Sequence, residues 1–381
     1  MNNFPPELIH QISACCDFMT KVRCSWVSRT WRRNINWTVA ERESLLNYAS
    51  QHGYLALVDK LLGDARINDL ARTDALVFAS AAGHLSVVDR LLEDERCNPA
   101  IGNKFPVVEA SANGQLSVVE RLLEDDRFNP AVDCNCAIIA ASENGHLSVV
   151  ECLLQDERVD PSDLTNRAIT DASTNGHLSV VDCLLQDERV DPSDEDNSAI
   201  IEASTNGHLL IVERLLQDER VDPAAQDNCA IFFASANGHL AILERLLHDE
   251  RVDPAAEENA ALRVASEYGH LPVVERLLAY KQVDPSSGDN QAIRLASKEG
   301  HLLIVERLLQ DKRVNPAAND NAAILQARDN EHFEIIERLL QDPRVNPAAR
   351  DYEAIINASK EGHRLIVERL FQQFHDHLGD R

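Results

Sequence analysis

The fold is decided by Ala296-Ser297-Lys298-Glu299-Gly300-His301-Leu302-Leu303-Ile304-Val305-Glu306-Arg307-Leu308-Leu309, a stretch that recurs along most of the 381-residue chain. A Gly-His-Leu triplet or a close variant returns every 31 residues, after a first step of 30. Its glycines are Gly53, Gly83, Gly114, Gly145, Gly176, Gly207, Gly238, Gly269, Gly300 and Gly362, and Glu331 occupies the remaining slot. Such a period indicates stacked supersecondary units that bury their apolar faces against one another. The sequence therefore predicts eleven repeats over residues 39–372.

Each repeat reads as two helices. Apolar and small residues lie three and four apart before Gly300 and again after it, which is the spacing of one helix face. Gly300 ends the first helix because glycine tolerates a left-handed C-terminal cap. Proline in the connection, as at Pro316, disfavours a paired strand. We expect an all-α solenoid with little or no β-hairpin, and helix N-caps at the recurrent Asn135, Asn166, Asn197, Asn228, Asn259, Asn290 and Asn321.

The charge of the chain is strongly acidic and unevenly distributed. The formal net charge is −26, and residues 1–40 carry +3, so the rest of the chain carries −29. This surface repels phosphate backbones, which argues against nucleic-acid binding. No apolar run approaches the roughly 18 residues of a membrane span, and residues 1–7 do not read as a secretory signal. The nine cysteines are an odd number and read as reduced thiols, which favours the cytoplasm or the nucleus.

The stretch Ala296–Leu309 resembles the ankyrin repeat, whose consensus contains Ala-Ala-x-x-Gly-His-Leu followed by Val-Val-x-Leu-Leu. The resemblance covers most of the chain and implies stacked helix pairs whose first helices line a concave face that binds a client protein. The repeat is about two residues shorter than the usual ankyrin repeat. The loss falls where ankyrins place their β-hairpin finger, and Ser198-Ala199-Ile200-Ile201 replaces the usual Thr-Pro-Leu-His opening. These departures make binding through hairpin tips doubtful.

The N-terminal segment resembles an F-box. Phe4-Pro5-Pro6-Glu7-Leu8 and Val27-Ser28-Arg29-Thr30-Trp31 are similar to the Leu-Pro-x-Glu-Leu and Val-Ser-x-x-Trp elements of that family. Phe4 replaces the usual leucine, and residues 14–18 match weakly. The resemblance implies docking to a Skp-type adaptor and, through it, to a cullin–RING ubiquitin ligase. By this resemblance the docking or core residues are Pro5, Leu8, Ile12, Val27 and Trp31.

The domain organisation follows from these two resemblances. Residues 1–38 form a small helical module, residues 39–372 form the repeats, and residues 373–381 extend the last helix. About thirty residues cannot build a self-sufficient core, so the module packs on the repeats, on a partner, or on both. The alternative to adaptor docking is a plain N-terminal cap, which a solenoid needs in any case. The chain is expected to be a monomer outside its complex.

Residues that suggest chemistry recur too regularly for an active site. A histidine follows the glycine position in nine repeats, and an acidic residue stands six residues after that position in all eleven. The histidines read as structural, and the acids read as a solvated ladder of ion pairs worth about 0–1 kcal/mol each. Cys134-x-Cys136 lacks zinc-ligand spacing, and Cys152 and Cys183 read as replacements for arginine. We expect no enzyme activity, no cofactor and no metal.

Two positions in each repeat vary strongly, six and five residues before the glycine. They range from Phe232-Phe233 to Thr170-Asp171, which indicates that at least one of them faces out of the core. Aromatic and arginine residues dominate interface energies, and two stacked arginines select an acidic group on a partner. The alternative is that these residues fill the core. The predicted partner-binding patch consists of Phe232, Phe233, Arg263, Val264, Arg294 and Leu295.

Overall fold

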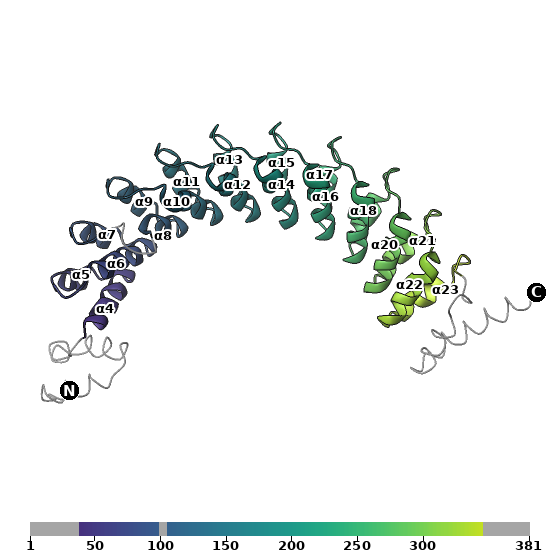
Figure 1. Cartoon of the computed structure of the whole chain (residues 1–381), viewed down its shortest axis with the longest axis horizontal. Coiled ribbons are helices and arrows are strands. Elements are labelled where there is room, and N and C mark those ends of the chain that lie inside the picture. Colours follow the sequence, from purple (N-terminus) through teal and green to yellow (C-terminus); the bar gives the residue numbers. More distant parts are fainter. Residues whose placement is uncertain (1–37, 99–104, 346–381) are drawn as a thin grey trace, which may run out of the picture. The chain divides into compact units, whose positions relative to one another are not determined.

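The computed structural model describes residues 38–98 and 105–345 of the chain (Figure 1). These residues form ten helix pairs, with no strand in either range, as the sequence predicts. The first helices are α4 (Val39–Gln51), α6 (Asp69–Ala81), α8 (Pro106–Ala112), α10 (Val132–Glu143), α12 (Asp163–Thr174), α14 (Asp194–Asn206), α16 (Ala225–Ala236), α18 (Ala256–Glu267), α20 (Ser287–Glu299) and α22 (Ala318–Asp329). The second helices are α5 (Leu55–Leu62), α7 (Leu85–Leu92), α9 (Leu116–Leu123), α11 (Leu147–Leu154), α13 (Leu178–Leu184), α15 (Leu209–Leu215), α17 (Leu240–Leu246), α19 (Leu271–Leu277), α21 (Leu302–Leu309) and α23 (Phe333–Leu340).

The chain divides into two compact units. The first unit comprises Met1–Ala172 and Ser179–Val190, and the second comprises Ser173–Leu178 and Asp191–Arg381. Within the second unit, the first helices α14, α16, α18, α20 and α22 pack side by side. The second helices α15, α17, α19, α21 and α23 form a second row (Figure 1). We call α14, α16, α18, α20 and α22 the first-helix row. The core lies between the two rows, where residues such as Ile293 and Val305 are almost fully buried.

The recurrent asparagine is not an N-cap, which corrects the sequence prediction. In α20 the asparagine is the last of three residues with left-handed backbone, Gly288, Asp289 and Asn290, at φ 56°, 55° and 60°. Asparagine tolerates this conformation better than most residues. Its side chain reaches the next repeat, where the Oδ1 of Asn290 accepts a hydrogen bond of 2.6 Å from the backbone N–H of Asn315. The same bond joins Asn259 to the N–H of Asp284 at 2.9 Å.

The glycine and the histidine of adjacent repeats fit together. Gly300 ends α20 with φ 86°, as predicted, and a methyl group on it would lie 2.7 Å from the His332 ring. The Nε2 of His332 lies 2.9 Å from the carbonyl oxygen of Lys298 at the end of the same helix. His301 has the same relation to the carbonyl of Glu267, at 2.8 Å. The recurrent histidines that the structure shows in this contact therefore connect repeats, as the structural interpretation expects.

A second link between repeats uses the connecting loops. Arg189 binds the Asp187 carboxylate through two nitrogens, at 2.9 and 2.6 Å, and donates through Nη1 to the carbonyl of Val159, at 2.7 Å. We call this arrangement the Asp-x-Arg bridge. In five other repeats the arginine of this motif likewise donates through Nη1 to the backbone carbonyl thirty residues earlier. These arginines are Arg127, Arg158, Arg251, Arg313 and Arg344. Tyr280-Lys281-Gln282 stands in the place of this motif in one repeat.

The Asp-x-Arg bridges make stability depend on pH. Hydrogen bonds from the paired arginine lower the pKa of each bridge carboxylate. The carboxylates concerned belong to Asp125, Asp156, Asp187, Asp218, Asp249, Asp311 and Asp342. A carboxylate with a lowered folded-state pKa stabilises the fold above its unfolded pKa of about 3.9, and this contribution disappears as pH falls through the folded value. We expect the melting temperature to be nearly constant between about pH 7 and 5 and to fall steeply below about pH 4. Circular dichroism melts at fixed ionic strength measure this, and an unchanged melting temperature at about pH 3 contradicts it.

The recurrent acidic residues of the second helices form the expected ladder. Arg121 donates to Asp89 at 2.8 Å, and the Nε of Arg276 lies 3.2 Å from the Glu244 carboxylate, in each case across to the preceding repeat. Arg90 pairs with Asp59 in the same way. These arginines are about one-third exposed and the acids about one-half exposed, so each pair contributes little to stability.

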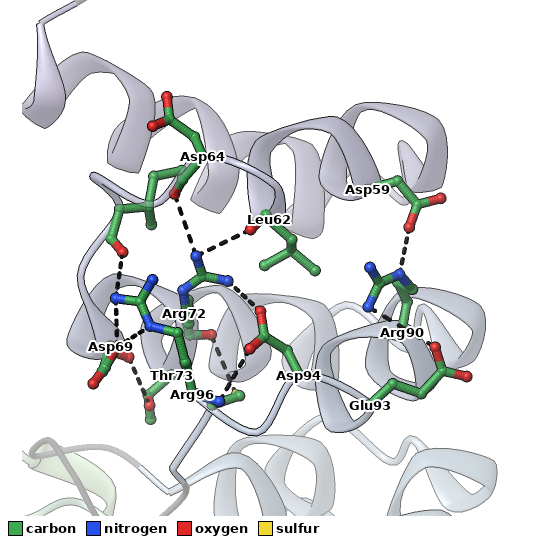
Figure 2. Close-up of polar contacts among 12 residues, drawn as sticks. Asp59, Leu62, Asp64, Asp69, Arg72, Thr73, Arg90, Glu93, Asp94 and Arg96 are labelled. Atoms are coloured by element: carbon green, nitrogen blue, oxygen red, sulfur yellow. Dashed lines mark hydrogen bonds and ion pairs between the residues drawn. The ribbon is translucent and has the colours of Figure 1, made fainter.

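A buried charge network in the first unit is centred on Arg72 in α6 (Figure 2). The Arg72 side chain is 1% exposed. It pairs with Asp94 and donates to the carbonyl oxygens of Leu62, at 3.1 Å, and Asp64, at 3.3 Å. Arg96, which occupies the arginine position of the Asp-x-Arg motif in this repeat, instead donates to Asp69 at 2.8 Å. Arg72 thus joins three consecutive segments of the chain at one point.

Candidate interaction surface

The predicted patch lies on three neighbouring helices of the first-helix row. Phe232 and Phe233 belong to α16, Arg263 and Val264 to α18, and Arg294 and Leu295 to α20. Contacts join α16 to α18 and α18 to α20, so the six residues occupy equivalent places on adjacent helices. The repeat period thus brings together residues that are more than sixty positions apart in sequence.

The aromatic part of the patch is a pair of phenylalanines. The rings of Phe232 and Phe233 are 5.2 Å apart at 80°, an edge-to-face arrangement. Both side chains are half-buried, so each combines packing against the row with surface open to solvent. Edge-to-face contacts favour this relative orientation of two rings, which leaves a defined apolar surface.

Val264 differs from the prediction. It is 7% exposed and therefore belongs to the core of α18, whereas Leu295, the equivalent residue of α20, is half-buried. Variation among repeats correctly indicates that the position is not uniformly core, but the exposure of each copy depends on its neighbours. The apolar surface of the patch therefore consists of Phe232, Phe233 and Leu295.

Arg263 is held at one edge of the patch. Its Nη1 donates to the backbone carbonyl of Glu258 at 3.3 Å and lies 3.7 Å from the Glu258 carboxylate. The Glu258 side chain is 75% exposed, and an ion pair so open to water is weak. Arg263 itself remains 25% exposed and open to a further acceptor.

Arg294 lies one repeat further along and is half-buried. Its Nε is shielded from solvent and, within the part of the chain that the structure describes, has no hydrogen-bond partner. A shielded donor without an acceptor costs about 1–3 kcal/mol, and more when it is charged. The guanidinium of Arg294 is therefore incompletely hydrogen-bonded in the free chain, although the Nε itself is too shielded for a carboxylate to reach unless the side chain moves.

Comparison of equivalent positions in the repeats did not identify two further features of this surface. Gly288 occupies the start of the left-handed turn, where the other copies in the second unit carry Glu195, Gln226, Glu257 and Asn319. A methyl group at Gly288 would lie 3.9 Å from the Nη1 of Arg263. Residues 260–300 also carry five basic and five acidic residues, so this stretch is neutral within a chain of net charge −26. A charge count in windows along the sequence finds this second feature.

Other candidate sites do not acquire chemistry. Burial raises the pKa of the Cys152 and Cys183 thiols, which keeps them protonated and unreactive at neutral pH. Among the described residues, no group of three or more histidine, cysteine or acidic side chains is placed to hold a metal ion. Within the same residues, none of the helices has the length and apolar character required to cross a membrane.

The predicted adaptor-docking residues lie outside the described residues, as do the eleventh repeat and the C-terminal extension at residues 373–381. They are Pro5, Leu8, Ile12, Val27 and Trp31. Their assignment remains a prediction from the sequence.

Comparison with known proteins agrees with the observed architecture. The family described as "Ankyrin repeats (3 copies)" matches in overlapping sets at residues 46–135, 107–196, 137–227, 200–289 and 231–320. The crystal structure of the human ASB11 ankyrin repeat domain is 19% identical, with a TM-score of 0.41, and the match covers 50% of this chain and 96% of that one. No curated protein sequence matches the chain. Since the family matches span most of the sequence, the chain belongs to the ankyrin-repeat family.

Proposed function

We propose that this ankyrin-repeat protein is a substrate-recognition subunit of a cullin–RING ubiquitin ligase. In this role the N-terminal module docks a Skp-type adaptor, and the first-helix row binds a client protein. The observation that carries the proposal is the order of the chain, in which Pro5-Pro6-Glu7-Leu8 and Val27-Ser28-Arg29-Thr30-Trp31 precede a long array of interaction repeats. This role requires the cytoplasm or the nucleus, which fits the odd number of cysteines.

The constant residues of the repeats support a binding role without catalysis. The histidines contact a backbone carbonyl of the preceding repeat, and the loop aspartates pair with arginine. Catalytic acids and bases need environments that set their pKa values apart, whereas a repeated array gives each copy nearly the same surroundings. What differs from repeat to repeat is the pair of positions on the first helices.

The second candidate is a plain ankyrin scaffold whose N-terminal segment only caps the array. One observation favours it: Val39 of α4 is 42% exposed and Leu70 of α6 is 46% exposed, so apolar surface lies at the start of the repeats. A cap would cover such surface. Adaptor docking and capping make different demands on Pro5 and Trp31, so they can be separated by experiment.

Capture of a purified Skp-type adaptor by the full chain tests the proposal. We expect the wild type to bind and Pro5→Ala/Trp31→Ala to lose at least about tenfold in affinity, because truncating an interface aromatic commonly costs 2 kcal/mol or more. Pro6→Ala/Trp37→Ala is the matched control, since it removes the same residue types at the variable x position of Leu-Pro-x-Glu-Leu and outside the motif, and it should bind like the wild type. Absence of binding by the wild type would leave the scaffold alternative standing.

A further inference from the structure

Three observations single out the segment between α18 and α20. The Nε of Arg294 is shielded and has no hydrogen-bond partner within the described residues, and Arg263 is paired only loosely with Glu258. Both guanidinium groups belong to equivalent positions of adjacent helices in the first-helix row. A carboxylate accepts two parallel hydrogen bonds from one guanidinium, and such charge-assisted bonds are about twice as strong as neutral ones.

The sequence around these arginines removes the acidic residues that other repeats carry. Tyr280-Lys281-Gln282 replaces the acidic Asp-Glu-Arg motif of the preceding loop, Asp249-Glu250-Arg251. Gly288 replaces a longer side chain beside Arg263. Residues 260–300 are neutral, so a carboxylate meets less repulsion here than the net charge of −26 for the whole chain would suggest.

Apolar surface lies next to the arginines on the same row. Phe232 and Phe233 form their edge-to-face pair on α16, and Leu295 follows Arg294 on α20. All three side chains are half-buried, which provides contact area without exposing a large unsupported patch. Aromatic residues and arginine at the centre of an interface carry most of its binding energy.

We propose that Arg263 and Arg294 form a carboxylate-binding site, and that Phe232, Phe233 and Leu295 accept an apolar side chain beside it. The partner is a segment of a client protein in which aspartate or glutamate stands close to an aliphatic or aromatic residue. The proposal rests on the client-binding role of the first-helix row but not on adaptor docking. It assigns the acidic group to Arg294 first, because the half-buried guanidinium of Arg294 is incompletely hydrogen-bonded.

Selection of random peptides displayed on phage against the immobilised full chain tests this site. We expect selected peptides to be enriched in aspartate or glutamate next to leucine, isoleucine or phenylalanine. Synthetic copies of the best peptide with Glu→Gln or Asp→Asn should bind about 10- to 100-fold more weakly, which corresponds to the loss of one or two charge-assisted hydrogen bonds.

Variants of the chain supply the controls. Arg263→Gln/Arg294→Gln should lose the same factor in affinity, and Phe233→Ala should weaken binding while keeping the preference for an acid. Arg245→Gln/Arg307→Gln makes the same change in net charge on the second helices α17 and α21 and should bind like the wild type. Circular dichroism confirms that each variant is folded.

Several outcomes would overturn the site: no enrichment, enrichment in lysine or arginine, or equal binding by Arg263→Gln/Arg294→Gln and the wild type. The result is independent of the adaptor experiment. Acid-selective peptides with no adaptor capture would contradict the ligase role and keep the site. Adaptor capture with no acid preference would support the ligase role and contradict the carboxylate-binding site.

Discussion

Replacing Arg72 with alanine is expected to lower the free energy of unfolding by about 3–5 kcal/mol, because it leaves a buried ion pair with one partner. The guanidinium is 1% exposed, and Asp94 is 16% exposed. Without Arg72, the Asp94 carboxylate and the carbonyl oxygens of Leu62 and Asp64 lose a shared donor (Figure 2).

Urea unfolding of the full chain measures this effect, together with amide hydrogen exchange of α5 to α7. Exchange is needed because a repeat array can lose a few repeats before the rest. Arg66→Ala is the matched control, since its side chain is 59% exposed in an ion pair with Asp64 and should contribute little to stability. A loss below about 1 kcal/mol for Arg72→Ala would show that the network does not hold these repeats together.

Gly114→Ala is expected to destabilise the chain by about 2–5 kcal/mol, for two separable reasons. The backbone at Gly114 has φ 69°, which costs an L-residue about 1–2 kcal/mol. A methyl group there would also lie 2.6 Å from the Nδ1 of His146 in the next repeat, and relieving that overlap costs about 1–3 kcal/mol. The expected loss comes from the junction between two repeats rather than from either repeat alone.

Gly63→Ala is the control for this substitution. Gly63 has φ −69°, and a methyl group there meets no atom closer than 3.6 Å, so alanine should be neutral or slightly stabilising. The double variant Gly114→Ala/His146→Ala removes the overlap but keeps the backbone cost, so a double-mutant cycle separates the two. Equal stability of Gly114→Ala and Gly63→Ala in urea titrations would contradict the close packing of His146 against Gly114.

Local rules predicted those features of the fold that depend on one repeat alone. The period fixed the helix pairs, and Gly300 ends α20 in the expected left-handed conformation. The asparagine prediction failed because the role of Asn290 depends on a backbone N–H twenty-five residues away, which a capping rule within one helix does not include. Contacts between repeats, rather than propensities within them, decide such positions.

The patch was predictable to a similar depth. Variation among copies found Arg263 and Arg294, because a position that holds phenylalanine in one repeat and threonine or arginine in others is not uniformly core. It did not distinguish Val264, 7% exposed, from the half-buried Leu295, since exposure depends on the side chains of adjacent repeats. Nor did it identify Arg294 as the residue with an unsatisfied donor, which only the packed structure shows.

The most direct test of the central claim, that the first-helix row of the second unit binds a client, is a hydrogen-exchange footprint. Amide exchange of the full chain is compared with and without the best acidic peptide from the selection. We expect added protection in α16, α18 and α20, and no added protection in Arg263→Gln/Arg294→Gln. Protection confined to the second helices α17, α19 and α21, or to the first unit, would contradict it.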